Sequence, residues 1–436
     1  MERRTLEQKE NLRDWAVLVG LRSPVLREDN ADEESLQELA ALVETAGGEA
    51  VGTILQSRDK PDPHSFIGEG KVEEVKRMVE EEHATMVIFD NDLSPSQIRV
   101  LTELLGVQVI DRSGLILDIF AQRAKTKEGC LQVELAQYQY LLPRLVGMWT
   151  HLERQAGTSG KGPIGSKGPG ETQLETDRRH IHRKIDKLKE ELEEVRRVRS
   201  TQRQRRMKNE IPVVAIVGYT NAGKSTLLNA ITGAGIPANN RLFDTLDTTT
   251  RLLTVSDTLD VVISDTVGFI RKLPHQLVEA FKATLEELEY ADLLVHVIDA
   301  SNPLWQQQAE IVENLIRELK ADQIPCIRVY NKSDLAFSGE RAKEEDAVSI
   351  SALTGEGIGD LLALIDRKLD KGTRRVTIHL PYDKAGMLDS LYREAKVESV
   401  EYGATIDIVA VCTPKVMGQI KDYIEGWKEP KEEWEM

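Results

Sequence analysis

The chain has 436 residues, more than one hydrophobic core usually serves, so it should fold into several domains. Its composition, 40% hydrophobic and 30% charged, is that of globular protein and excludes wholesale disorder. The charged N-terminus excludes a signal peptide, and no apolar run approaches the roughly 18 to 20 residues of a membrane span. We therefore expect a cytoplasmic protein without stable membrane insertion.

The formal net charge of −16 argues against a general attraction to a phosphate backbone. This average conceals one local exception, the Lys- and Arg-rich segment 178–208. A basic element able to meet nucleic acid thus persists inside an acidic protein.

Residues 1–126 alternate short apolar runs, such as "WAVLVGL" at 15–21, with amphipathic ones. Apolar runs separated by helical patterns are typical of β-α repeats around a mostly parallel sheet. A small α/β domain is therefore predicted over 1–126. The lone "GEGK" at 68–71 is interpreted as a turn into a helix and not as a phosphate loop.

A helical hairpin is predicted over 127–209. From Cys130 apolar residues recur three and four apart, which predicts a long helix with a kink at Pro143. A heptad seam follows later, and two such helices joined by a short loop must run antiparallel to cover each other. The two apolar stripes are Leu131, Leu135, Tyr138, Leu142, Leu145, Trp149 and Leu152, and Ile181, Ile185, Leu188, Leu192 and Val195.

The glycine-rich stretch 157–170, "GTSGKGPIGSKGPG", lies at the tip of this hairpin. Because no strand precedes it, it lacks the geometry of a phosphate-binding loop. Two interpretations stay open: a slim loop that enters an RNA cavity, or a disordered turn. Trp149 serves packing or base stacking, and His180 and His182 face solvent or RNA, since no metal-ligand cluster accompanies them.

The β-α alternation resumes over 210–370, which predicts a second and larger α/β domain. The residues that follow, 371–436, show a strand, a helix, two strands and a helix. They predict a small α+β domain.

A phosphate-binding loop is predicted at 218–225, "GYTNAGKS", between the apolar strand "VVAIV" and the helix "STLLNAI". Lys224 supplies a cation to the β and γ oxygens, and Ser225 offers a hydroxyl to Mg2+. The predicted fold class is thus α/β, with a P-loop domain preceded by a small α/β domain and a helical hairpin. The loop consists of Gly218, Tyr219, Thr220, Asn221, Ala222, Gly223, Lys224 and Ser225.

The tetrapeptide "DTVG" at 265–268 follows the apolar run "LDVVIS", where a Walker B carboxylate belongs. Asp265 is expected to hold Mg2+ through water, and the N–H of Gly268 to meet the γ-phosphate. Thr266 and Val267 complete this set of predicted nucleotide contacts.

The tetrapeptide "NKSD" at 331–334 predicts that the base is guanine. The Asp334 carboxylate can accept both the N1–H and the 2-amino group of guanine, whereas adenine offers neither donor in that arrangement. The motifs thus predict a GTPase; an ATPase requires "NKSD" to be accidental. The predicted base contacts are Asn331, Lys332, Ser333 and Asp334, with Ser351, Ala352 and Leu353 resembling the loop that supports the guanine O6.

A switch threonine should complete the Mg2+ coordination from the loop "FDTLDTTTR" at 243–251. We assign it to Thr245, with Thr248, Thr249 and Thr250 as alternatives. The predicted nucleotide contacts of this loop are Phe243, Asp244, Thr245, Leu246 and Asp247.

Two departures from small regulatory GTPases bear on mechanism. Phe269 stands where those proteins carry the glutamine that orients the attacking water, so slow turnover is expected for the protein alone. Asn221 either binds K+ beside the phosphates, as in GTPases that use this ion in place of an arginine finger, or stabilises the loop. The predicted catalytic set is Lys224, Thr245, Gly268 and Asn221.

The order of these motifs closely resembles that of the HflX-type translational GTPases, over essentially the whole chain. The likeness rests on the glycine-rich stretch with "ETQLETDRRHIHRKI", then "GYTNAGKST", "FDTLDTTTR", "DTVGFIRKLPHQLVEAFKATLEE" and "NKSD". The resemblance carries over as nucleotide contacts the segments 218–225, 265–268, 331–334 and 351–353 together with Thr245, with Ser225 and Thr245 on Mg2+. The switch loop departs from the expected "TLDPTTR" by reading "TLDTTTR".

The resemblance implies a cytoplasmic, monomeric GTPase that binds GTP and GDP and associates with the 50S ribosomal subunit and its rRNA. It further implies dissociation or recycling of stalled ribosomes under stress, with hydrolysis stimulated by the ribosome. Two alternatives stay open: a GTP-timed ribosome-assembly factor, and a nucleotide-sensing RNA-binding module with little hydrolysis.

Overall fold

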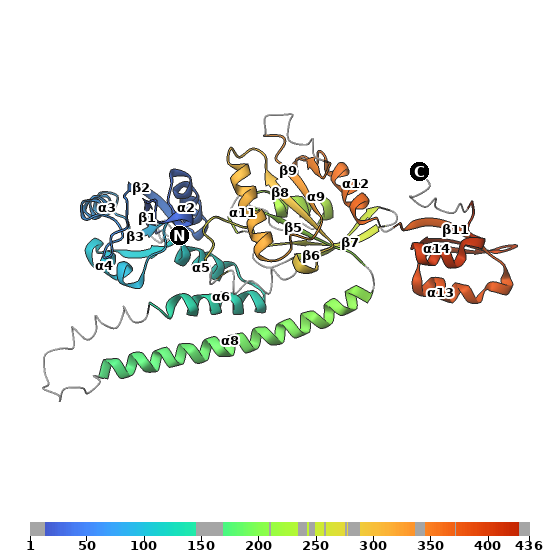
Figure 1. Ribbon diagram of the computed structural model, residues 1–436, viewed down its shortest axis with the longest axis horizontal. Helices are drawn as coiled ribbons and strands as arrows, with labels where there is room; N and C mark the ends of the chain where they lie inside the picture. Colours follow the sequence, from blue (N-terminus) through green and yellow to red (C-terminus); the bar gives the residue numbers. More distant parts are fainter. Residues whose placement is uncertain are drawn as a thin grey trace, which may run out of the picture.

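The computed structural model describes residues 14–144, 169–208, 211–233, 242–243, 249–256, 259–274, 277, 288–335, 345–370 and 372–426. Figure 1 shows an N-terminal α/β domain, a pair of helices beside it, a larger α/β domain and a C-terminal module that stands apart. The predicted fold class is therefore confirmed. Within the described ranges, no helix combines the length and apolar character needed to cross a membrane.

The N-terminal domain is a four-stranded parallel sheet with helices on both faces. Its strand order is β2-β1-β3-β4. Residues 16–21 of β1 are buried, as expected for a parallel strand covered on both sides. Helices α2 and α5 pack on one face, and α3 and α4 on the other. The elements are β1 Trp15–Arg22, α2 Glu33–Ala46, β2 Glu49–Ser57, α3 Glu69–Glu81, β3 Met86–Phe89, α4 Pro95–Leu105, β4 Gln108–Asp111 and α5 Arg112–Arg123.

The "GEGK" run opens a helix, as predicted. Gly68 is the N-cap of α3, and its N–H bonds the side chain of Gln56 at 2.9 Å. The run therefore joins two elements of the N-terminal domain.

The helical hairpin consists of α6, Lys127–Leu141, and α8, Pro169–Lys208. The apolar seams pack on each other, Leu131 and Leu135 of α6 against Ile185, Leu188 and Leu192 of α8. The predicted pairing of the two stripes is thus confirmed.

One detail of the hairpin differs from the prediction. Helix α6 ends at Leu141, and residues 142–144 around Pro143 form a turn. The predicted continuation past residue 144 lies outside the described residues. Proline has no N–H with which to extend the helical ladder, so the helix ends before it. Leu145, Trp149, Leu152 and the stretch 157–168 lie outside the described residues.

The larger domain is built on a six-stranded sheet of order β10-β9-β8-β5-β7-β6. Only the edge strand β6 is antiparallel to its neighbour. Helices α9 and α12 pack on one face, and α11 on the other. The elements are β5 Val213–Gly218, α9 Lys224–Thr232, β6 Thr249–Ser256, β7 Leu259–Asp265, β8 Leu293–Asp299, α11 Trp305–Glu318, β9 Cys326–Asn331, β10 Ala347–Ser349 and α12 Ile358–Leu369.

The C-terminal module is an antiparallel sheet of order β11-β13-β12. Its order of strand, helix, two strands and helix is the one predicted. Both helices bury apolar side chains against the sheet. Lys396 pairs with Asp260 of the larger domain at 2.9 Å. The elements are β11 Arg374–Leu380, α13 Gly386–Glu394, β12 Lys396–Tyr402, β13 Ile406–Cys412 and α14 Pro414–Ile420.

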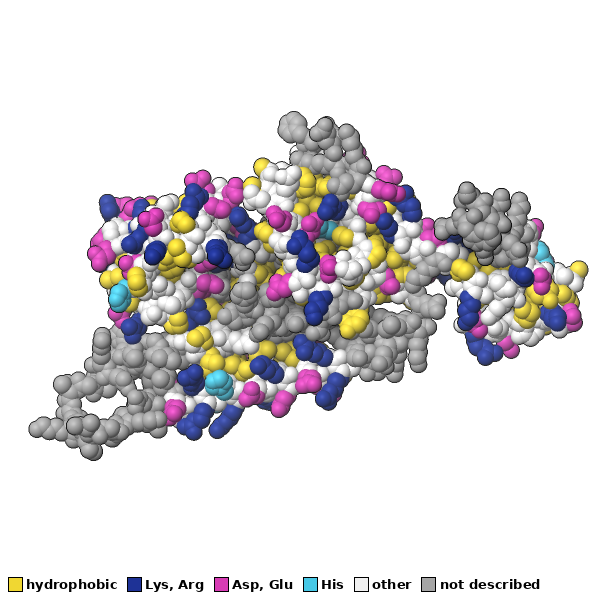
Figure 2. Space-filling model, in the orientation of Figure 1, with side chains coloured by type: hydrophobic (Ala, Val, Ile, Leu, Met, Phe, Trp, Pro, Cys, Tyr) yellow, Lys and Arg dark blue, Asp and Glu magenta, His cyan; other side chains and the backbone are white. Residues whose placement is uncertain are grey.

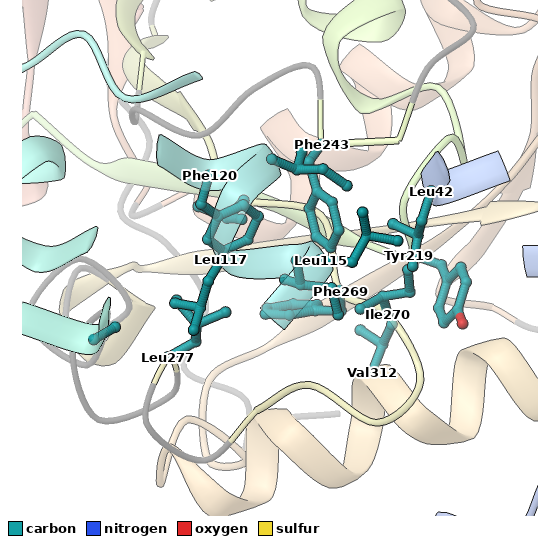
Figure 3. Close-up of a cluster of buried hydrophobic side chains, with 14 of the residues drawn as sticks. Leu42, Leu115, Leu117, Phe120, Tyr219, Phe243, Phe269, Ile270, Leu277 and Val312 are labelled. Atoms are coloured by element: carbon teal, nitrogen blue, oxygen red, sulfur yellow. The ribbon is translucent and has the colours of Figure 1, made fainter. Parts of the chain in front are cut away.

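One apolar cluster crosses from the N-terminal domain into the P-loop domain (Figure 3). The ring of Phe120 in α5 meets that of Phe243 edge to face, with centroids 4.7 Å apart. Tyr219 and Phe269 belong to the same cluster. The sequence predicts these two domains as separate units and does not predict the shared core.

Candidate nucleotide-binding site

The P-loop lies between the end of β5 and the start of α9. Gly218 ends the strand, and Lys224 begins the helix. Gly223 is the N-cap in the left-handed region, at φ 94°, which glycine adopts without a steric penalty. The amides at the start of α9 therefore converge where a phosphate binds in proteins of this geometry.

Lys224 is buried within the loop, with 6% of its surface exposed. Its Nζ donates to the carbonyl oxygens of Gly218 and Tyr219 at 3.1 and 2.9 Å. Burial lowers the pKa of Lys224 to about 8, and the nearby carboxylate of Asp265 opposes that shift. The lysine is thus a partly desolvated cation that an anionic phosphate would stabilise.

Nucleotide affinity is expected to fall as the pH rises above about 8, where Lys224 of the free protein loses its proton. A bound phosphate favours the charged lysine and raises its pKa, so binding at about pH 8.5 must take up a proton. Calorimetry of GDP binding in two buffers of different ionisation enthalpy measures this uptake. Equal heats in both buffers would contradict it.

The residues predicted to hold Mg2+ lie together. The Ser225 hydroxyl donates to a carboxylate oxygen of Asp265 at 2.8 Å, where β7 ends beside α9. Hydroxyl and carboxylate oxygens suit this hard cation, which otherwise keeps water and phosphate oxygens as ligands. The donor set therefore fits a magnesium ion shared with a nucleotide.

Gly268 lies directly against the P-loop. A Cβ at this position would stand 2.8 Å from Thr220 Cγ2 and 2.9 Å from Lys224 Nζ, closer than real side chains pack. Only glycine brings the backbone this near to the lysine, next to the predicted position of the γ-phosphate.

Asn331 ties the base-recognition motif to the P-loop. Its Nδ2 donates to the carbonyl of Ala222 at 2.8 Å, and its Oδ1 accepts from the N–H of Ala352 at 2.9 Å. Lys332 pairs with Asp299 at 2.6 Å, and Asp334 is exposed beyond them. The structure thus brings three predicted segments to the carboxyl ends of β5, β9 and β10, with the Asp334 carboxylate open to a ligand.

The switch loop is described only at its ends. Asp244, Thr245, Leu246, Asp247 and Thr248 lie outside the described residues, so the Thr245 assignment stays a prediction. Phe243 is 2% exposed and its ring packs on Phe120, so any nucleotide contact there falls to its backbone. The alternatives Thr249 and Thr250 pair with β7 in the ladder of β6.

The side chain of Phe269 lies in the shared core, with 2% exposed. Its backbone pairs with the loop: the N–H of Thr220 donates to the Phe269 carbonyl at 2.7 Å, and the Phe269 N–H to the Gly218 carbonyl at 3.2 Å. The side chain of Phe269 therefore cannot orient water, as the sequence predicts.

Tyr219 is a site residue whose role sequence reasoning missed. It was predicted only as part of the nucleotide-contacting loop, yet its phenol oxygen points away from the apolar cluster toward the N-terminal domain (Figure 3). An aromatic residue among the small residues of a P-loop was the one available signal.

Four family models match the chain in order. Their descriptions are GTP-binding GTPase N-terminal at 33–121, GTP-binding GTPase middle region at 123–206, 50S ribosome-binding GTPase at 213–332 and HflX C-terminal domain at 337–407. The last of these spans β10 and α12 as well as much of the C-terminal module.

The protein GTPase HflX of Caldanaerobacter subterraneus is 48% identical over 394 residues, which cover 90% of this chain and 91% of that protein. This chain belongs to the HflX family of GTPases. GTPase HflX of Escherichia coli is also 48% identical, over 84% of this chain and 86% of its own. A solved GTP-binding protein of Sulfolobus solfataricus, in complex with GDP, is 25% identical, covers 81% of this chain and 98% of its own, and has a TM-score of 0.43.

As an HflX GTPase, the chain hydrolyses GTP to GDP and phosphate. GTPases of this kind normally use Mg2+, which neutralises the charge that develops on the phosphates. The P-loop amides and Lys224 are the groups predicted to hold the phosphates.

Proposed function

We propose that this HflX GTPase binds the 50S ribosomal subunit and uses GTP hydrolysis to dissociate or recycle stalled ribosomes under stress. The observation that carries the proposal is the outer face of α8. The apolar seam of α8 packs on α6, which leaves basic side chains exposed along the helix, among some acidic ones (Figure 2). These exposed cations include Arg178, Arg179, Arg183, Lys187 and Lys189.

The shape and charge of the helical hairpin support an RNA partner. A long, slim helix pair with cations outward can approach phosphates that repel the rest of an acidic protein. The matched family model described as a 50S ribosome-binding GTPase supports the choice of subunit. We assign rRNA contact to α8 and the glycine-rich stretch that precedes it.

Within this function we propose that the predicted nucleotide contacts act as assigned, with Ser225, Asp265 and Thr245 on Mg2+. Because Phe269 faces the core, the protein alone should hydrolyse GTP slowly, and the ribosome should order the switch segments or supply the missing group. The protein is proposed to act as a monomer.

GTP hydrolysis is expected to rise strongly when 50S subunits are added, and sucrose-gradient sedimentation should show 70S particles splitting with the protein and GTP. Deletion of 157–170 should leave GTP binding intact and abolish splitting. Equal hydrolysis with and without 50S subunits would contradict ribosomal activation. Binding to 50S without splitting would instead identify a GTP-timed assembly factor.

We also propose K+ as a second cofactor at Asn221. This residue lies within the P-loop, adopts a left-handed backbone at φ 61° and is exposed. Turnover in K+ should exceed turnover in Na+ at equal ionic strength. Equal rates in K+ and Na+ would indicate that Asn221 stabilises the loop and does not bind K+.

A further inference from the structure

The side chain of Tyr219 joins the P-loop to two other parts of the molecule. It is 4% exposed, and its phenol oxygen accepts the backbone N–H of Arg271 at 2.9 Å. The same hydroxyl donates to a carboxylate oxygen of Glu38, which lies on α2 of the N-terminal domain. One oxygen atom thus connects the P-loop, the segment after "DTVG" and a neighbouring domain.

The carboxylate that holds this phenol is itself fixed by buried charges. Glu38 pairs with the guanidinium of Arg112, which is 1% exposed and also binds Asp90 at 2.7 Å. Asp90 in turn accepts from Lys272 at 2.5 Å. Since Lys272 directly follows Arg271, these contacts form a closed chain that returns to the segment it started from.

The segment that begins with "DTVG" contacts the P-loop at the position where the γ-phosphate is expected. Backbone bonds join Phe269 to Gly218 and Thr220, and Gly268 lies against Lys224. The phenol of Tyr219 adds a bond at Arg271, just beyond that pair. The hydroxyl therefore limits how far the backbone after "DTVG" can shift relative to the phosphates.

We propose that Tyr219 is a positioning residue for GTP hydrolysis, whose phenol, anchored by Glu38, fixes the backbone after "DTVG" so that the Gly268 amide meets the γ-phosphate. The proposal rests on the assignment of Gly268 to that phosphate. A catalytic amide must be held within a fraction of an ångström to favour the transition state over the ground state. Burial and the adjacent Glu38 both raise the pKa of Tyr219, so the phenol keeps its proton and remains a donor.

Tyr219→Phe tests the hydroxyl while it keeps the ring in the shared core. In single-turnover hydrolysis without ribosomes, we expect the rate to fall about tenfold, or ~1.4 kcal/mol, with GDP affinity and melting temperature unchanged. Tyr140→Phe is the matched control: the Tyr140 hydroxyl also donates to a carboxylate, Asp111, at 2.7 Å, but within the N-terminal half of the chain. This control should hydrolyse GTP at the normal rate.

A double-mutant cycle tests the anchor. Glu38→Gln alone should slow hydrolysis, and adding it to Tyr219→Phe should slow it little further, because both changes remove one connection. Independent, multiplying effects would overturn the role of Glu38.

Three results distinguish a failure of this proposal from a failure of the assignments on which it depends. A normal rate in Tyr219→Phe, or a rate loss matched by lost GDP affinity and stability, overturns the positioning role. Gly268→Ala would crowd Thr220 and Lys224 and should cost more GTP affinity than GDP affinity; equal loss of both overturns the γ-phosphate assignment itself. Because all these assays omit ribosomes, their interpretation does not depend on whether 50S subunits activate the enzyme.

Discussion

Asp334→Asn is expected to weaken GTP binding by about 2 to 4 kcal/mol, roughly 30- to 1,000-fold, and to create affinity for xanthosine triphosphate. The Asp334 carboxylate is exposed just after β9, beside the Asn331 bonds that hold the P-loop and the 351–353 loop together. Guanine offers two donors to a carboxylate, whereas an amide presents one acceptor and one donor. Xanthine carries an oxygen in place of the 2-amino group, so the amide donor then finds a partner.

Equilibrium titration with fluorescent GTP and xanthosine analogues measures both affinities. Asp322→Asn is the matched control, because Asp322 is exposed at the opposite end of β9 and loses the same charge. The control should bind GTP normally. Retained GTP binding in Asp334→Asn would show that this carboxylate does not recognise the base.

The placement of the site could be predicted because local patterns decide it. An apolar run followed by "GYTNAGKS" predicts a strand, a loop and a helix, and β5, the loop and α9 follow in that order. The carboxyl ends of neighbouring parallel strands meet at one edge, so Asp265 and Asn331 reach the loop as well. The assignment of each residue to a nucleotide atom stays a prediction.

The contact between the domains could not be predicted because it depends on packing between distant segments. Phe243 and Phe269 were interpreted from their motifs alone, yet both fill a core shared with Phe120. Arg271 and Lys272 look like an ordinary basic pair in the sequence, but they bind carboxylates of the N-terminal domain. Neither periodicity nor motif spacing indicates which acidic residues they will pair with.

Arg112→Met is expected to destabilise the N-terminal domain by about 3 to 5 kcal/mol, because it removes the cation shared by the buried carboxylate of Asp90 and the partly buried carboxylate of Glu38. Arg112 is 1% exposed and pairs with both Glu38 and Asp90. Methionine keeps much of the apolar volume, so the loss reports on charge more than on packing. Amide hydrogen exchange of β1 and β3 in the full chain measures the local stability.

Arg375→Met is the control for this change. Arg375 pairs with Glu398 at 2.7 Å on the C-terminal module, but its side chain is 55% exposed. An exposed ion pair contributes about 0 to 1 kcal/mol, so this variant should exchange its amides almost normally. A comparable loss in both variants would contradict the importance of burial.

The pH dependence of the Arg112→Met deficit distinguishes lost charge from lost packing. Burial alone would raise the pKa of Asp90, but Arg112 and Lys272 hold it below its usual value. In the normal protein this lowered pKa contributes stability above the unfolded value, and that contribution is lost as the pH falls through the folded value. Without Arg112, Lys272 remains as the cation bound to Asp90, so the pKa of Asp90 rises and the carboxylate takes up a proton at a higher pH than before. The stability gap between variant and normal protein should therefore narrow as the pH falls below neutral, whereas a gap independent of pH would assign the loss to packing.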